Sequence, residues 1–221
     1  MRFAAFGAQL RISLINILTF LDKSLRSLPY QSGGFDMDMW EPVFSQAQVA
    51  RAAGLESTQR MRLWFNRNQL NFTECEPASK LALRLSARMA LHVAIMNAAT
   101  TQWVPPVVAN SAATVFLQAG STDLQTGAIR LPGELFAEPW TVLAIPQLGK
   151  PRILHLPDES GLIAITGHEY AMNGFTLIVL DRIYREVVAR LQEFSNERPF
   201  RRQPSGDVAR LADVKQPFKR G

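Results

Sequence analysis

Apolar residues recur at helical spacing in several separate parts of the chain, and short apolar runs lie between the later ones. Ser45 is a residue type that caps helices, so a helix is expected over Gln46–Ala53, with Gly54 ending it. A second helix is expected from about Ser57 to Asn68. The few residues between them predict a tight turn.

The apolar positions of the second expected helix indicate which of its sides faces the core. Met61, Trp64 and Phe65 fall on one face, and Leu63 is also expected to pack in the core. Arginines occupy the other faces. Two further arginines, Arg51 before the turn and Arg88 later in the chain, are expected on solvated helix faces.

Two longer helices are expected next. Ser86 is a good N-cap for a helix that runs to about Ala99. The prolines in Trp103–Pro106 break it, because proline lacks the amide hydrogen that a helix interior requires. Another helix then spans Val107–Gln118 and ends at Gly120.

The pattern then changes to short β-branched or aromatic runs separated by turn residues, which is typical of a small sheet. Strands are expected at Trp140–Ile145, Ile153–Leu156, Leu162–Thr166 and Phe175–Leu180. A final helix, from Asp181 to about Phe194, has an apolar stripe formed by Leu180, Ile183, Tyr184, Val187, Val188, Leu191 and Phe194. Packing of this stripe on the protein's own sheet is favoured, with a second subunit as the alternative.

These elements predict an α+β fold, in which a pair of short helices precedes a helical hairpin and a small sheet with a C-terminal helix. The expected parts are a first domain at 40–100, a second part at 103–194 for dimerisation or for effector or partner binding, and a flexible basic tail at 195–221. Residues 1–38 are a leader, read either as an amphipathic helix or as residues before a translation start at Met37 or Met39.

Charge and cysteine usage narrow the functional classes. Residues 40–102 carry seven basic and four acidic side chains, and 195–221 carry seven and three, so these segments suit a polyanionic partner. Cys75 is the sole cysteine, which excludes an intrachain disulfide and is compatible with a reducing cytoplasm. The sequence lacks an uninterrupted apolar run of the length of a membrane-spanning helix.

The stretch from Phe44 to Leu70 has the residue types of a helix-turn-helix. Small residues such as Ala50 let two helices cross closely, and Gly54 tolerates a left-handed turn. Leu55 is expected to fill the space below the turn, and Trp64 to anchor the second helix. The N-terminal half of that helix offers groups that bond base edges and phosphates.

About residues 43–98 resemble the MerR family of winged helix-turn-helix regulators, through Ala50, Gly54, Leu55, Trp64 and Leu70. The interval from Gly54 to Trp64 is one residue longer than the family's, so Arg60 and Arg62 both remain candidates for base reading. The segment Lys80–Ser86 looks like the family's wing returning into a helix. The resemblance and the helix pattern together give these candidate DNA contacts: Gln46, Ser57, Thr58, Gln59, Arg60, Arg62, Arg67, Lys80 and Arg84.

The sequence therefore favours a cytoplasmic transcriptional regulator, of bacterial or phage type, that reads double-stranded DNA through a winged helix-turn-helix DNA-binding domain at 40–100. The alternatives are a phage packaging protein like the small terminases, an excisionase-like accessory protein, and an interaction protein that does not bind DNA. A homodimer and an effector are compatible with the second part. No enzymatic activity, cofactor or metal is expected, and the acidic and histidine residues of the sheet region are interpreted as surface residues: His155, Asp158, Glu159, His168 and Glu169.

Overall fold

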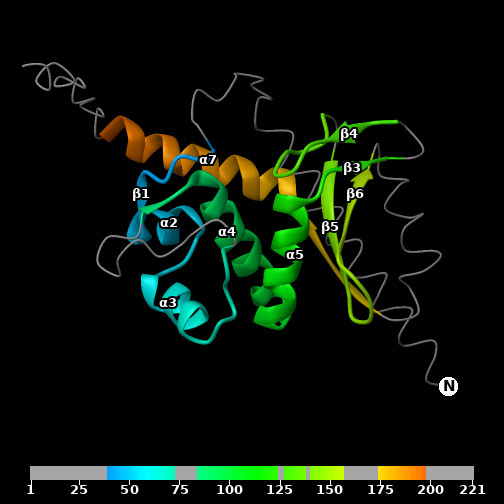
Figure 1. Ribbon diagram of the computed structural model, residues 1–221, viewed down its shortest axis with the longest axis horizontal. Helices are drawn as coiled ribbons and strands as arrows, with labels where there is room; N and C mark the ends of the chain where they lie inside the picture. Colours follow the sequence, from blue (N-terminus) through cyan, green and yellow to red (C-terminus); the bar gives the residue numbers. More distant parts are fainter. Residues whose placement is uncertain (1–38, 73–83, 124–126, 138–139, 157–173, 198–221) are drawn as a thin grey trace, which may run out of the picture.

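The computed structural model describes residues 39–72, 84–123, 127–137, 140–156 and 174–197. They form an α+β arrangement of helices and small antiparallel sheets, as predicted. Helices α2, α3 and α4 lie on one side of the molecule and a three-stranded sheet lies on the other, with α5 between them (Figure 1).

The first two helices begin and end close to the predicted positions. Helix α2 spans Gln46–Ala52 and is capped by Ser45, whose hydroxyl accepts the Gln48 amide while the Gln48 side chain accepts the Ser45 amide. Helix α3 spans Thr58–Asn66, two residues short of the predicted end. Its N-cap, Ser57, accepts the Gln59 amide.

Helix α4, Ala87–Thr101, is the central helix, and its first ten residues are all buried. Ser86 caps it as predicted, and its hydroxyl accepts the Met89 amide. Helix α5, Pro106–Gln118, packs along α4 and begins with a proline, which suits a first turn where no amide donor is needed.

The expectation that Arg88 lies on a solvated face of α4 is wrong, since Arg88 is 6% exposed. Its guanidinium donates to the Leu117 carbonyl near the end of α5 and lies 3.7 Å from the centre of the Trp40 ring. The physical reason is that neighbours cover α4 at this end on every side. An aromatic face and a helix-end carbonyl stabilise the buried cation.

Within the described residues, three antiparallel sheets complete the fold. Strands β1, Phe44–Ser45, and β2, Arg84–Leu85, pair and join the start of α2 to the start of α4. Strands β3, Ser121–Thr122, and β4, Ile129–Arg130, form a second pair. The third sheet has the order β6-β5-β7 and contains β5 (Trp140–Pro146), β6 (Arg152–Leu156) and β7 (Phe175–Val179).

The three strands of the third sheet were predicted within one residue at each end, and Leu162–Thr166 lies outside the described residues. The last helix, α7, spans Leu180–Glu197 and so continues three residues into the predicted tail. Its apolar stripe packs on β5, as expected, and also on α2 and α4. The leader and the rest of the tail lie outside the described residues.

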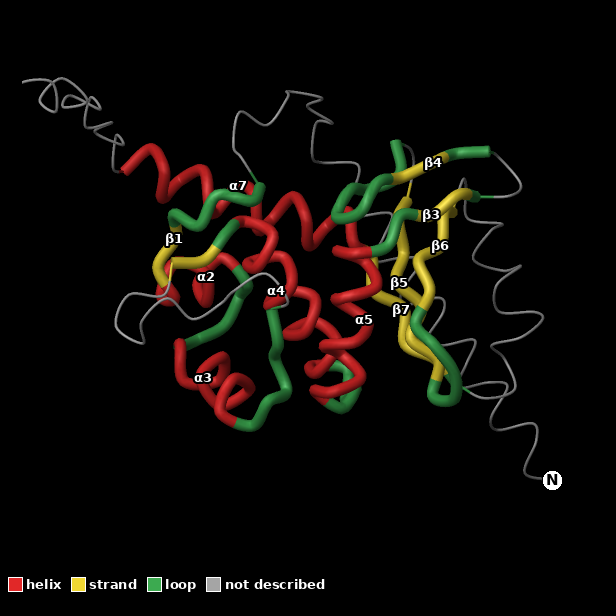
Figure 2. The backbone as a smooth tube through the Cα atoms, viewed as in Figure 1, coloured by secondary structure: helices red, strands yellow, loops and turns green. Residues whose placement is uncertain are grey.

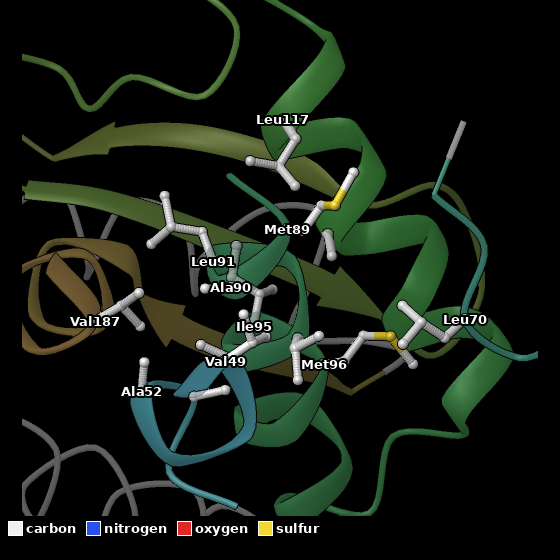
Figure 3. Packing of buried hydrophobic residues seen from close by; sticks show 14 of the residues in the cluster. Val49, Ala52, Leu70, Met89, Ala90, Leu91, Ile95, Met96, Leu117 and Val187 are labelled. Carbon is white, nitrogen blue, oxygen red and sulfur yellow. The ribbon is translucent and has the colours of Figure 1, made fainter. Parts of the chain in front are cut away.

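One hydrophobic core joins the two predicted parts of the chain. Figure 3 shows Val187 of α7 facing Ala52 of α2, and Leu117 of α5 beside Met89 of α4. The same cluster extends to Leu143 in β5. The predicted boundary near residues 100–103 therefore does not separate two cores. Among the described residues, no helix has the length and apolar character needed to cross a membrane.

Candidate nucleic-acid interface

The turn between α2 and α3 has the predicted construction. Gly54 is exposed and has a φ of +71°, a left-handed conformation that glycine adopts without strain. The Leu55 amide donates to the Ala50 carbonyl over 2.9 Å, which closes the turn. Ala50, Leu55, Trp64 and Leu70 are buried, at 2–8% exposure, so the predicted structural residues of the motif do lie in the core.

Two residues that sequence reasoning missed hold this turn from outside the motif. Asn97 of α4 donates from its amide nitrogen to the Ala53 and Gly54 carbonyls, each over 3.2 Å. Arg190 of α7 donates to the Ala52 carbonyl over 3.0 Å. These bonds satisfy carbonyls that the end of α2 leaves without helical partners. Nothing in the local pattern singles out either residue, because each acts on a distant segment.

The structure separates the two candidate base-reading arginines. The Arg60 guanidinium lies against α4, donating to the Asn97 side-chain oxygen over 3.2 Å and to the Thr100 hydroxyl over 3.0 Å. It also lies 5.2 Å from the centre of the Trp64 ring. Arg62 instead projects from the exposed side of α3, where its Nε contacts the Gln46 side-chain oxygen over 3.5 Å. Arg60 therefore helps to orient α3 against α4.

The outward face of α3 consists of Gln59, Arg62, Leu63 and Asn66, all exposed. Their spacing of three, one and three residues places them on one side of the helix, opposite Met61 and Trp64. The expectation that Leu63 packs in the core is wrong, since Leu63 is 43% exposed. It lies two residues after the buried Met61, which turns it to the far side of the helix.

The other candidate contacts lie elsewhere on the described residues or outside them. Arg67 follows the end of α3 and is exposed, and Arg84 of β2 is exposed and donates to the Val43 carbonyl over 3.2 Å. Thr58 is half-buried at the start of α3, after the Ser57 cap. Lys80 lies outside the described residues.

The electrostatics of α3 favour an anionic partner. The helix carries two arginines and no acidic residue, and the exposed Glu56 is the one carboxylate directly before its N-cap, so the helix itself has a net charge of +2. It lies at the edge of the molecule, away from the three-stranded sheet (Figure 2). Arg51 of α2 is exposed, as predicted, with its guanidinium 5.3 Å from the centre of the Phe194 ring.

The cluster of histidine and acidic residues in the sheet region, expected at the surface, is described only at His155, whose side chain is 5% exposed, so that expectation is wrong for His155. His155 and Asp123 are joined by a contact of 2.8 Å between Nδ1 and Oδ2, and the His155 ring packs on Phe136. The other members of that cluster lie outside the described residues, as does Cys75. Within the part of the chain that the structure describes, no three histidine, cysteine or carboxylate side chains gather in a way that would hold a metal ion.

A buried histidine lies under the helical hairpin. His92 of α4 contacts the Asn110 side-chain oxygen over 2.8 Å and meets the edge of the Phe72 ring. Burial lowers the pKa of His92 to about 4, the positive charge of Arg88 acts in the same direction, and the bond to Asn110 opposes both. The ring is therefore neutral at physiological pH, and it donates a hydrogen bond to Asn110 without carrying charge.

No protein-family model matches this chain, and no curated protein is similar to it in sequence. The candidate interface therefore rests on the residues and the geometry of α3 and the turn before it.

Proposed function

We propose that α2 and α3 form the helix-turn-helix of a protein that reads double-stranded DNA, and that α3 is the helix that enters the major groove. The observation that carries the proposal is the outward face of α3, formed by Gln59, Arg62, Leu63 and Asn66 without an acidic residue. An arginine can donate two hydrogen bonds to the edge of a guanine, and a glutamine or asparagine can form two hydrogen bonds with the edge of an adenine.

The dimensions of α3 suit this role. With its side chains an α-helix is about 10–12 Å in diameter, which matches the width of the major groove, about 12 Å. The nine residues of α3, at about 1.5 Å each, give a rod about 14 Å long. Arg67, directly after the end of α3, and Arg84 of β2 are exposed arginines suited to contact phosphates, which would position the protein on the duplex. Arg62 is the preferred base-reading arginine, because Arg60 is engaged with α4.

The pairing of β1 with β2 supports a winged form of the motif. Phe44 pairs with Leu85 and Ser45 with Arg84, so the segment that returns from the predicted wing lies beside the start of α2. The resemblance to the MerR family implies a wing that returns into the helix after Ser86, and β2 leads into that helix. Within this proposal the protein works as a transcriptional regulator, and the sheet with α7 supplies contacts to a second copy or to an effector.

The proposal is tested by titrating the purified chain with duplex DNA at several salt concentrations. A steep fall in affinity with rising salt is expected, because arginines displace counterions from phosphates. Arg62→Ala should weaken binding to a preferred sequence about tenfold or more. Arg152→Ala is the matched control, since Arg152 is an exposed arginine on β6 and should not contact DNA.

Two results would overturn the proposal: no binding to any duplex, or equal losses for Arg62→Ala and Arg152→Ala. The cellular role is then resolved by mapping bound sites across the genome. Sites upstream of genes support a regulator, whereas concentration at a single phage locus supports a packaging or excision role.

A further inference from the structure

Leu63 is a large apolar side chain exposed in the middle of a polar helix face. It is 43% exposed, four residues after Gln59 and three before Asn66. A single exposed leucine is common on protein surfaces and carries no meaning alone. The neighbours of Leu63 on α3 give its exposure a meaning, because each of them can bond a base edge. If α3 enters the major groove, Leu63 meets the bases too.

We infer that Leu63 reads thymine through the C5-methyl group in the major groove. This inference rests on the proposed function and adds a specificity to it. The thymine methyl is the one apolar group that a base pair presents in the major groove, and apolar side chains contact it. A leucine can bond neither a phosphate nor a polar base edge, so the methyl is its matching partner in the groove.

The helix geometry sets the size of the site. From Gln59 to Asn66 the axis rises about 10 Å, at about 1.5 Å for each residue, which equals about three base-pair steps. Gln59 and Asn66 are suited to adenine, and Arg62 to guanine. The target of one α3 is therefore a subsite of three or four base pairs in which a thymine lies opposite Leu63.

A protein partner fits this face less well than DNA does. An apolar docking site on a protein needs several exposed apolar side chains together, whereas Leu63 is surrounded by Gln59, Arg62 and Asn66. Arg62 adds a positive charge beside the leucine, and α3 contains no carboxylate that would repel phosphates. Duplex DNA offers a thymine methyl group to Leu63 and hydrogen-bond acceptors to Arg62, so it is the partner that matches both residues.

The test removes the methyl group from the DNA and the side chain from the protein. Sequences bound by the full chain are first selected from random duplexes. Each thymine of the selected site is then replaced, one at a time, by deoxyuridine, which pairs identically but lacks the methyl. At one position, replacing thymine by deoxyuridine should weaken binding of the unaltered protein about fourfold, the effect expected for losing one buried methyl group.

The variant Leu63→Ala should bind the thymine duplex more weakly, and it should bind the thymine and deoxyuridine duplexes equally at that position. Leu148→Ala is the matched control, since Leu148 is 75% exposed beyond the end of β5 and should leave the discrimination intact. Circular dichroism should show the fold of both variants unchanged, because neither side chain is buried.

The outcomes separate this inference from the proposed function. If the protein binds duplex DNA but no deoxyuridine position matters, Leu63 does not read thymine and the DNA-binding proposal stands. If discrimination survives in Leu63→Ala, another residue reads the methyl and the inference is overturned. Failure to bind any duplex would overturn the proposed function itself.

Discussion

Acidification should destabilise this protein through His92. In the folded chain, burial lowers the pKa of His92 to about 4, whereas an unfolded chain has the ordinary value of 6.5. Between these two values the unfolded state binds a proton that the folded state does not. The free energy of unfolding therefore falls as the pH falls from 6.5 to about 4, and the loss levels off once the folded state also takes up the proton.

The size of the loss follows from the same two values. A difference from 6.5 to about 4, at about 1.4 kcal/mol for each pKa unit, corresponds to about 3 kcal/mol. That is a large share of the stability of an ordinary domain, which is about 5–15 kcal/mol. His92 alone therefore removes a substantial part of the stability, and the full loss is reached only near pH 4.

The assay is urea unfolding at a series of pH values and constant ionic strength, with His92→Gln as the matched variant. Glutamine can still donate a hydrogen bond to Asn110 but does not titrate. Asp181, whose pKa burial raises, shifts stability in the opposite direction, because the folded state binds that proton first. Its effect is common to both proteins, so the difference between their curves isolates His92.

The unaltered protein should lose about 3 kcal/mol more than His92→Gln over this pH range. Parallel curves would refute the reasoning. They would mean that the folded state accommodates a charged ring at position 92, for example by water reaching the small cavity lined by His92, Phe72 and Thr114.

Two further variants test how α3 is held. Trp64→Ala should cost about 3–5 kcal/mol in urea unfolding, because Trp64 is 3% exposed and belongs to the shared core; a loss below about 1 kcal/mol would contradict that placement. Asn97→Ala should cost about 1–3 kcal/mol, since it removes two donors to the turn and the acceptor of Arg60. Stability of Asn97→Ala equal to that of the unaltered protein would show that the turn bonds contribute nothing.

Local signals predicted the elements of this fold well. Ser45, Ser57 and Ser86 mark the starts of three helices because a cap bonds amides within its own first turn, a contact that depends on neighbouring residues only. The turn at Gly54 follows from the same kind of local chemistry. The apolar stripe of α7 likewise identified the side that is buried, though it did not identify the helices that cover it.

Contacts between distant segments are what the sequence left undetermined. Arg88 and Leu63 were assigned to opposite environments from those observed, because burial depends on which elements pack around each helix face. Arg130 shows the same limit: it is 2% exposed and donates to the Phe116 and Ala119 carbonyls at the end of α5. In the candidate interface, Arg62 and Arg60 are two residues apart, and only the position of α4 distinguishes their roles.

The bond from Arg190 to the Ala52 carbonyl has a consequence for how the chain folds during synthesis. The two residues are 138 positions apart, so the end of α2 receives this donor only when almost all of the described chain has left the ribosome. Contacts of such long range slow folding, because the ends of a long loop must first meet. Until then, Val49 and Ala52 present apolar surface that α7 later covers. A nascent or truncated chain that stops before α7 should therefore depend on chaperones, even though it contains the whole of α2 and α3.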